Sequence, residues 1–536
     1  MKKYSFSYFL GACLIFLSAC NGFLDEAPLG QMSSETFFET EEDLRFGSTG
    51  LYDILNSNNL YGHTISLVGD LGADIWTHNG GFVPFEELDR YSFTSNMNIG
   101  NIWWVSNYRG IARCNFYIKG VQNSEFAGTA VAERYLGEAY FIRALLYFNL
   151  VRTYGDVPLD TVGAEDLSQI YTRDATEDVY TAILNDLQRA KEILPVIQAQ
   201  KGRATRGAAH GLLVKTYLTM AGQPLNKGMS HYQLALQEAI SFEDSVVAGA
   251  YPYELLDDYP SIFSEINENN AEIVFDVQAI AGPQEGTRWG KWGGWDGPQN
   301  DIDFASNGAP KAVPSFYDSY SVEDIIRQNW NILDSFVNAN GALKFRTNPT
   351  QYSIAKFRPE FNSFEINGEY VSFQSPHNTP ILRYDDVLLM LAEAENEVNG
   401  PTELAYEMLN RVRERVKITP LTASNFSELY PEYQAEDAGI DLNVEQDRFR
   451  EAIFWERAWE LCYEGHRRFD LIRWGRLVPT VQNLMPTQAY VDLNNAQPVN
   501  RQLFSPVNIR EHHALFPIPQ QEMDVAQNDF VQNEGY

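Results

Sequence analysis

A segment rich in tryptophan and glycine carries residue types well suited to ligand binding. It runs Arg288-Trp-Gly-Lys-Trp-Gly-Gly-Trp-Asp296, so the rings of Trp289, Trp292 and Trp295 fall within seven residues. Indole rings stack on apolar ligand faces, and charged ends such as those of Arg288 and Asp296 hydrogen-bond polar groups. Because the glycines predict a loop, we expect at least one ring to face ligand. The alternative is a local cluster in which the rings pack on one another.

A second candidate segment spans residues 74–85. It places Trp76, His78, Asn79 and Phe82 around two consecutive glycines. The combination of rings with an amide and an imidazole again suits a ligand that has both apolar faces and hydrogen-bonding groups. Aromatic residues make up 13% of the chain, which leaves rings for a binding face once a core is filled.

The usual catalytic signatures are absent from the sequence. There is no Gly-x-Ser-x-Gly, His-Glu-x-x-His or Cys-x-x-Cys pattern. The glycine-rich stretch 286–291 is not a phosphate loop, because Trp292 stands where Ser or Thr is needed. The missing motifs disfavour an enzyme. A glycoside hydrolase stays open as an alternative, since that chemistry needs only two carboxylates.

We predict no cofactor and no metal site. Asp301-x-Asp303 resembles the start of a calcium loop, but Ala305 stands at a ligand position. His512 and His513 are interpreted as a surface pair and not as metal ligands.

The N-terminus has the pattern of a lipoprotein export signal. Two lysines precede an apolar run over 6–16, which is shorter than the roughly 20 residues of a membrane span. Leu17-Ser-Ala-Cys20 follows, with small residues before a cysteine. We therefore expect residues 1–19 to be removed, Cys20 to be acylated and residues 20–33 to form a tether. The alternative is an ordinary secretory signal in which the cysteine is accidental.

Composition narrows the range of partners. The formal net charge of −32 argues against nucleic acid and against docking on anionic lipid surfaces. After the signal, no apolar run approaches a membrane span, so the lipid is the only expected membrane contact. Cys114 and Cys462 lie in apolar helical patterns, which favours two buried free thiols, with one disulfide as the alternative.

Helices must position the candidate segments. Apolar residues recur at intervals of three and four over 133–154, on two faces, so this helix is predicted to pack between neighbours. Trp103 and Trp104 are interpreted as packing residues inside another helix. Gly207 and Gly211 predict the close approach of a partner element. The predicted helices are 36–55, 100–121, 133–154, 176–194, one that starts near Thr205, 232–240, 385–398 and 402–416.

The fold class predicted is mainly α. Helix pairs of this length are typical of tetratricopeptide-type repeats of about 34 residues, which stack into a solenoid. Residues 251–380 are rich in Gly, Pro, Asn and aromatics, with short strand-like runs such as 272–279. We predict one domain over 34–536, with a helical scaffold at 34–250 and 381–480, a loop-rich region at 251–380 and an extended C-terminal segment at 481–536.

Several motifs resemble those of the SusD/RagB family, and the resemblance covers nearly the whole chain. The most specific is Glu464-Gly-His-Arg-Arg-Phe-Asp-Leu-Ile-Arg-Trp-Gly475. The others are Phe23-Leu-Asp25, Glu138-Ala-Tyr-Phe-Ile-Arg143, Tyr154-Gly-Asp-Val-Pro158, Arg383-Tyr-Asp-Asp-Val-Leu388, Leu409-Asn-Arg-Val-Arg413, Leu515-Phe-Pro-Ile-Pro519 and Gln532-Asn-Glu-Gly-Tyr536.

The resemblance implies a cell-surface lipoprotein of the bacterial outer membrane that is not an enzyme. Such proteins bind oligosaccharides, or sometimes peptides or other nutrients, and pass them to a TonB-dependent transporter of the SusC type. Asp25 and Glu26 resemble the family's surface-export signal. The family's binding face is built from an early and a middle loop, which places both candidate segments together.

The hallmark residues themselves are expected to be structural. Charged groups inside packed helices are normally paired, so we expect them to lock helices together and not to touch ligand. These residues are Glu138, Arg143, Asp156, Arg473 and Trp474.

Overall fold

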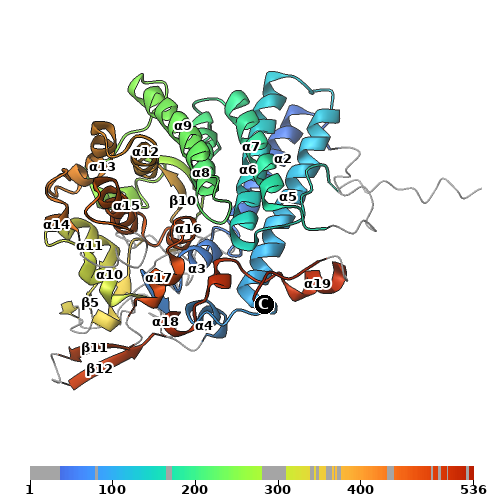
Figure 1. Ribbon diagram of the computed structural model, residues 1–536. Coiled ribbons are helices and arrows are strands. Elements are labelled where there is room, and N and C mark those ends of the chain that lie inside the picture. The colour runs from blue at the N-terminus through green and yellow to red at the C-terminus, as the bar shows by residue number, and fades with distance from the viewer. Residues whose placement is uncertain are drawn as a thin grey trace, which may run out of the picture.

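Helices dominate the computed structural model of the chain, as the periodicity predicts. They stand side by side across the molecule in Figure 1, with strands β5, β11 and β12 toward the lower left and β10 between the helices. The mainly α fold class is therefore confirmed. The residues that the structure describes are 37–78, 82–163, 172–280, 310–337, 343–345, 349–357, 365–366, 369–370, 376–430, 440–484, 487–492, 497–503, 505–526 and 530–536.

The first block of helices stacks in chain order. Helix α2 packs against α5 and α6, and each helix from α5 to α9 packs against the next, as expected for a solenoid. Helix α6 is buried on nearly every face because its neighbours cover opposite sides. The bounds are α2 Glu41–Leu55, α5 Asn98–Asn123, α6 Ala130–Tyr154, α7 Thr176–Ile193, α8 Arg206–Ala221 and α9 Met229–Val247.

A second block continues the stack from a distant part of the chain. Helix α12 (Tyr384–Asn399) packs against α8 and α9 and also against α13 (Glu403–Arg415) and α15 (Glu445–Leu461). A Cβ atom at Gly211 on α8 would collide with Leu382, which lies just before α12. A Cβ at Gly207 would likewise collide with Tyr253. The close approach predicted at these two glycines is confirmed.

Short elements fill the remaining volume, and their strands pair in twos. The strand pairs are β1 Trp76–His78 with β3 Pro310–Ala312, β2 Ile273–Val277 with β10 Thr379–Arg383, β4 Ile332–Leu333 with β7 Ser353–Ile354, β5 Ser335–Val337 with β6 Leu343–Phe345, β8 Glu365–Ile366 with β9 Glu369–Tyr370, and β11 Thr487–Asp492 with β12 Gln497–Gln502. The short helices are α3 Thr64–Asp70, α4 Val83–Asp89, α10 Pro314–Ser319, α11 Ile325–Asn331, α14 Phe426–Leu429, α16 Arg467–Arg473, α17 Leu477–Gln482, α18 Ser505–Asn508 and α19 Gln520–Ala526, with 3-10 turns at Tyr259–Phe263, Pro349–Gln351 and Glu511–Ala514.

The hallmark charges of the first block lock helices together. Arg143 on α6 donates to both carboxylate oxygens of Asp186 on α7, each at 2.8 Å. Glu138, fully buried, accepts from Ser48 on α2 at 2.8 Å and pairs with Arg203 before α8. The structural role predicted for Arg143 and Glu138 is confirmed.

The remaining hallmark residues also serve packing. Arg473 pairs with Glu393 on α12, and the indole N–H of Trp474 donates to the same carboxylate at 2.9 Å. Asp156 accepts from the backbone N–H of Thr176, at 2.8 Å, at the start of α7. Arg473 and Glu393 are both buried, and a buried charge that is paired avoids the large cost of an isolated ion, so this pair fixes how α16 meets α12. Asp156 is exposed, and its contact fixes the start of α7.

A buried network of ion pairs ties the loop-rich region to α12, α13 and α15. Its five cations and six anions have side chains at most 2% exposed. The cations are Arg327, Lys356, Arg383, Arg413 and Arg415, and the anions are Glu272, Asp324, Asp385, Glu456, Glu460 and Glu464. The anions outnumber the cations by one, so protonation of one carboxyl group would balance the network.

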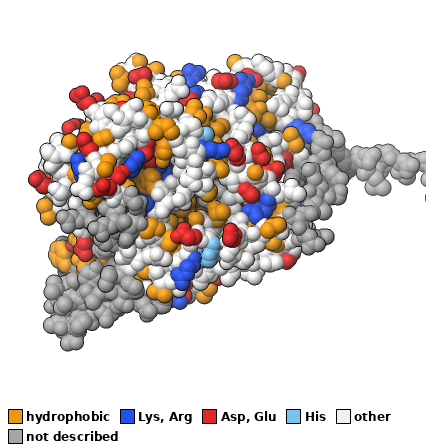
Figure 2. Space-filling model, viewed as in Figure 1, with side chains coloured by type: hydrophobic (Ala, Val, Ile, Leu, Met, Phe, Trp, Pro, Cys, Tyr) orange, Lys and Arg blue, Asp and Glu red, His pale blue; other side chains and the backbone are white. Residues whose placement is uncertain are grey.

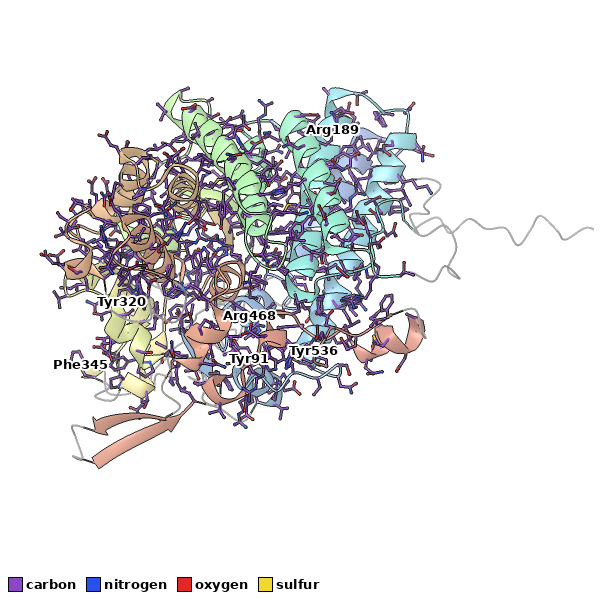
Figure 3. All side chains as sticks on the ribbon, viewed as in Figure 1. Tyr91, Arg189, Tyr320, Phe345, Arg468 and Tyr536 are labelled. Carbon is purple, nitrogen blue, oxygen red and sulfur yellow. The ribbon has the colours of Figure 1, made fainter. Side chains whose placement is uncertain are left out.

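Two cysteine predictions and one histidine prediction can be compared with the structure. Cys114 and Cys462 are buried free thiols, as expected, and burial raises the pKa of each to about 12. The surface interpretation of His513 is wrong. Its ring is buried against Tyr91 and Phe93, and Arg468 donates to its carbonyl. Arg468 also donates to the Tyr91 hydroxyl, and these two side chains lie close together in Figure 3.

The surface shown in Figure 2 mixes side chains of both charges with hydrophobic ones. Within the described ranges, no helix combines the length and the apolar character that crossing a membrane requires.

Candidate functional site

The strand pair β1–β3 joins part of the early candidate segment to residues that follow the middle one in the chain. Trp76 lies opposite Ala312, Thr77 opposite Lys311 and His78 opposite Pro310. His78 is the last described residue before Asn79, and Pro310 is the first described residue after 281–309. The chain therefore enters the stretch 79–81 and leaves the stretch 281–309 at the same end of the ribbon; where residues 288–296 lie relative to the early segment stays a prediction.

Most of the predicted ligand contacts lie outside the described residues. This holds for Asn79 and for every residue of the tryptophan-rich segment, namely Arg288, Trp289, Trp292, Trp295 and Asp296. It also holds for Cys20, for the tether 20–33 and for Asp301 and Asp303. These assignments stay predictions.

The structure corrects the interpretation of Trp76 and His78. The Trp76 side chain is 0% exposed and His78 is 8% exposed, so neither ring offers an open face for stacking. All of β1 is buried, because α4 covers it and β3 pairs with it. In this structure Trp76 and His78 are core residues that support the segment.

An aromatic cluster at the start of α4 does reach the surface. Phe82 is 44% exposed and packs edge-on against Phe85, with ring centroids 5.0 Å apart. Phe85 in turn contacts the rings of His78 at 5.2 Å and His63 at 5.6 Å. Among the described rings of the early segment, Phe82 is therefore the one best placed to meet a ligand, and its position beside two glycines was the sequence signal.

Polar side chains line the same ribbon. The Thr77 hydroxyl donates to Asp89 at 3.2 Å, and the Lys311 ammonium group donates to Ser353 at 3.4 Å. These residues are all buried, so they fix the ribbon and its register. The β1–β3 ribbon is consequently held in a fixed position by its own side chains.

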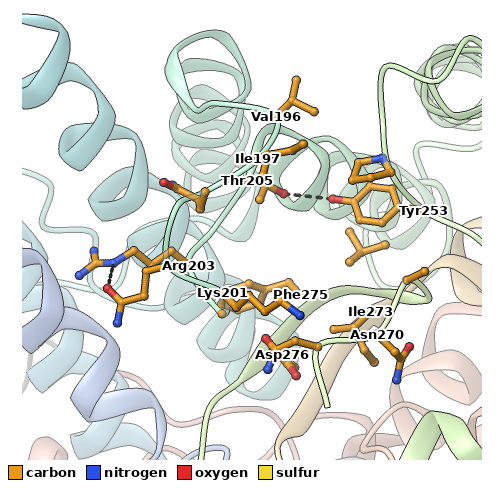
Figure 4. A pocket seen from close by; sticks show the side chains of 17 residues that line it. Val196, Ile197, Lys201, Arg203, Thr205, Tyr253, Asn270, Ile273, Phe275 and Asp276 are labelled. Atoms are coloured by element: carbon orange, nitrogen blue, oxygen red, sulfur yellow. Dashed lines mark hydrogen bonds between the residues drawn. The ribbon is translucent and has the colours of Figure 1, made fainter. Parts of the chain in front are cut away.

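A cavity of about 210 Å³ lies between the α7–α8 connection and the segment that leads into β2 (Figure 4). Its polar walls are largely bonded within the protein. Arg203 is held by Glu138, Thr205 lies 3.1 Å from the Tyr253 hydroxyl, and Asn270 donates to two backbone carbonyls. The cavity therefore offers few free hydrogen-bonding groups.

Asp276 is the carboxylate in the wall of this cavity. Burial raises its pKa to about 6, while Asn378 and Gln278 donate to it at 2.9 and 2.5 Å. Burial also raises the pKa of nearby Glu268 to about 8, and Glu268 accepts from the Asn378 backbone at 2.7 Å. Glycoside hydrolysis needs two carboxylates that flank a bond, and the described wall supplies one.

One group of carboxylates has the spacing of a metal site. Oxygens of Glu272, Asp385 and Glu460 lie within 4.8 Å of one another. The guanidinium groups of Arg383 and Arg415 pair with all three carboxylates. These three residues therefore form part of the ion-pair network and not a metal centre.

Comparisons with known proteins give matches along nearly the whole chain. The model of the SusD family matches residues 292–536. A second, SusD-like model, described as starch-binding and associating with the outer membrane, matches residues 22–218.

Individual relatives and solved structures match over nearly their full length. SusD-like protein P25 of Formosa agariphila is 29% identical, over 95% of this chain and 94% of that protein. The crystal structure of a SusD homolog from Bacteroides thetaiotaomicron is 27% identical with a TM-score of 0.78, over 94% of this chain and 98% of that one. A laminarin-binding SusD-like protein shares the fold at 24% identity and a TM-score of 0.70, over 93% and 100% of the two chains.

Proposed function

The chain belongs to the SusD/RagB family, and we propose that it is a cell-surface lipoprotein that captures oligosaccharides and delivers them to a partner TonB-dependent transporter of the SusC type. Three observations support the proposal. The fold matches a laminarin-binding relative, a matching family model is described as associating with the outer membrane, and the N-terminus has the pattern of a lipidation signal at Cys20.

The observation that carries the proposal is the pairing of β1 with β3. It places the end of the early segment, with Phe82 exposed close by, beside Pro310, the first described residue after the tryptophan-rich segment and the residues 297–309 that follow it. Sugars present apolar C–H faces and a rim of hydroxyls, so rings together with polar groups suit them. We propose that the ligand contacts are Trp289, Trp292 and Trp295 as stacking rings, with Phe82 beside them and Arg288, Asp296 and Asn79 as hydrogen-bonding partners.

Binding without turnover is part of the proposal. In the cavity beside β2, the described wall holds one carboxylate, Asp276, whose pKa burial raises. Asp276 already accepts two hydrogen bonds from neighbouring side chains. A general acid must be free to reach the leaving group, which this arrangement disfavours.

A glycan array followed by calorimetry tests the proposal. The full-length protein in detergent should bind one class of oligosaccharide with a Kd of about 10⁻⁶ to 10⁻³ M, as expected for a shallow stacked site. Alanine at Trp289, Trp292 or Trp295 should weaken binding about tenfold or more in at least one case, which corresponds to about 1.4 kcal/mol. Phe46→Ala is the matched control, because Phe46 is a 49% exposed ring on α2.

Other results would redirect the assignment. Unchanged affinity in all three tryptophan variants would refute the proposed site. Binding of peptides in place of glycans would make this a peptide-binding member of the same fold, and release of shorter sugars by the purified protein would establish a hydrolase. Delivery is tested separately, by co-purification of a TonB-dependent transporter from outer membranes in mild detergent.

A further inference from the structure

A second cavity, of about 250 Å³, lies between the two blocks of helices. Its walls come from the α8–α9 turn, α9, α12, α15 and the α16–α17 turn. The residues that carry the argument are Gln223, Tyr232, Glu393, Glu397, Arg450 and Trp474. None of them belongs to the segments that adjoin β1–β3.

The charged groups of this cavity are already neutralised in pairs. Arg450 forms two hydrogen bonds with Glu397, at 2.5 and 2.8 Å, and Arg473 pairs with Glu393 through both carboxylate oxygens. Arg476 is similarly paired with Glu451. Asp447 also pairs with Arg450, and Asp470 with Arg473. Every charged group of the lining is therefore held by an opposite charge, which favours a neutral polar ligand over an ion.

The Arg450–Glu397 pair is accessible from outside. Its side chains are 35% and 14% exposed, in contrast to the fully buried network at Glu460. A carboxylate accepts through several lone pairs and a guanidinium group has five N–H donors, so both can bond further partners while paired. Neighbouring hydroxyls of one ligand could therefore bond the carboxylate and the guanidinium group together.

Two rings give the cavity apolar surface. Trp474 is half-buried, and its N–H is fixed by Glu393 at 2.9 Å. Tyr232 on α9 is also half-buried, and within the described chain its hydroxyl makes no hydrogen bond. Burial and the carboxylates of Glu393 and Glu397 raise the pKa of Tyr232, which keeps the hydroxyl protonated and able to donate.

The α8–α9 turn, which forms one edge of the cavity, is held rigidly by backbone contacts. The backbone N–H of Gln223 donates to the carbonyl of Arg473 at 2.9 Å, so the α8–α9 turn is bonded to the end of α16. A Cβ atom on Gly222 would collide with that same carbonyl. A preformed site loses less conformational freedom on binding than a mobile one, which favours affinity for a small ligand.

The volume limits the size of the ligand. About 250 Å³ holds roughly eight waters at about 30 Å³ each, which matches one sugar ring. Sites for larger ligands usually measure about 300–1,000 Å³. From size, neutrality, rings and polar pairs together, we propose that this cavity is a second binding site, for a single neutral sugar ring or a polyol of that size.

This proposal goes beyond the proposed function and does not rest on it. Saturation-transfer NMR on the full-length protein in detergent tests it, with D-glucose, D-galactose, D-mannose, L-fucose and N-acetylglucosamine as probes. At least one should bind with a Kd of about 10⁻³ to 10⁻² M. Tyr232→Ala and Glu397→Gln should each weaken that binding fivefold or more.

Matched variants separate binding from folding. Glu133→Gln removes one partner of another partly exposed ion pair, with Arg189 on α7, and Tyr140→Ala removes another half-buried tyrosine. Both should leave monosaccharide binding unchanged. If Tyr232→Ala melts early, Tyr232→Phe keeps the ring and should still lose affinity severalfold through the missing hydroxyl.

The outcomes are decisive in both directions. Monosaccharide binding that persists in the Trp289, Trp292 and Trp295 variants but is lost in the cavity variants establishes two separate sites. Failure of every probe at about 50 mM, which is far above the expected Kd, or unchanged affinity in the cavity variants, would overturn the proposal. Preference for glucuronate over the neutral sugars would overturn the neutrality argument. Failure on the glycan array alone would touch only the proposed function.

Discussion

The guanidinium group of Arg143 on α6 donates two hydrogen bonds of 2.8 Å to the carboxylate of Asp186 on α7. The two side chains are 6% and 10% exposed. Arg143 also donates to the Asn115 amide oxygen on α5, at 2.8 Å, and to the carbonyl of Thr161. One residue therefore connects three helices and the segment that follows α6.

Asp186→Asn should destabilise the protein by about 3–5 kcal/mol, because it leaves the Arg143 charge buried without its partner. Chemical denaturation followed by circular dichroism measures the change in the free energy of unfolding. Glu133→Gln is the control, since the Glu133–Arg189 pair also joins α6 to α7 but is 29% and 44% exposed. An exposed pair should cost at most about 1 kcal/mol. Equal losses in both variants would contradict the structural role of Arg143.

Neighbouring residues Asp385 and Asp386 on α12 are both fully buried but should differ in how much a substitution destabilises the protein. Burial raises the pKa of Asp385 well above its usual range, despite Arg383 beside it. Burial acts in the same direction on Asp386, but Lys215 and Arg457 hold its pKa far below the usual range. Below about pH 4, where both states keep the Asp385 proton, Asp385→Asn should therefore cost about 1 kcal/mol. Asp386→Asn should cost about 3–5 kcal/mol.

The pH dependence separates the same two variants. The unfolded chain releases the Asp385 proton near pH 4 while the folded protein keeps it, so this group makes stability fall as the pH rises above about 4. Asp385→Asn removes that fall and should gain stability relative to wild type between pH 5 and pH 8. The Asp386 contribution is present above about pH 4 and is lost as the pH falls below it. Denaturation midpoints that shift in parallel for both variants would show that Asp385 is ionised.

Replacing either of two helical glycines with alanine should change the stability of the protein, in opposite directions. A Cβ atom at Gly69 on α3 would collide with the backbone of Gly465, whereas a Cβ at Gly50 on α2 has nothing within 4 Å. Gly69→Ala should cost about 1–3 kcal/mol through overpacking against backbone that cannot rotate away. Gly50→Ala should stabilise by about 0.5–1 kcal/mol, because alanine loses less entropy in a helix. Thermal unfolding of both variants measures the contrast, and a stable Gly69→Ala protein would show that α3 and Gly465 are not packed together.

The helices could be predicted well from the sequence because their apolar spacing is regular. The expected helix 133–154 is observed as Ala130–Tyr154. The helix expected at 232–240 is longer, Met229–Val247. Its last turns carry a buried acid, Glu243, which pairs with Arg411 and accepts from Tyr384. A buried polar residue of this kind breaks the apolar pattern, so periodicity ended the helix too early.

Exposure at the candidate site could not be predicted in the same way. An indole ring such as that of Trp76 suits a ligand contact. A strand of only three residues, however, shows no alternation of apolar and polar side chains, so the sequence does not indicate which face of β1 is buried. Its burial depends on β3, far along the chain, and on α4. The same reasoning applies to His513, whose neighbours Tyr91 and Phe93 are distant in sequence. In both cases tertiary packing decides whether the ring is exposed, and the residues next to it in the chain carry no signal of that packing.

Cys20 gives a prediction about location that is independent of the ligand. If Cys20 is acylated, the protein should sediment with outer membranes and incorporate labelled palmitate in cells. Cys20→Ser should remove the label and release the protein into the soluble fraction, because the stabilisation of about 0.8 kcal/mol per buried methylene is lost with the lipid chains. Cys13→Ser is the control, since it removes a thiol from the apolar part of the signal and leaves Cys20 in place. Label that persists in Cys20→Ser would exclude Cys20 as the acylated residue, and a membrane-bound protein without label would exclude the lipid anchor; either result would overturn the proposed mode of surface attachment.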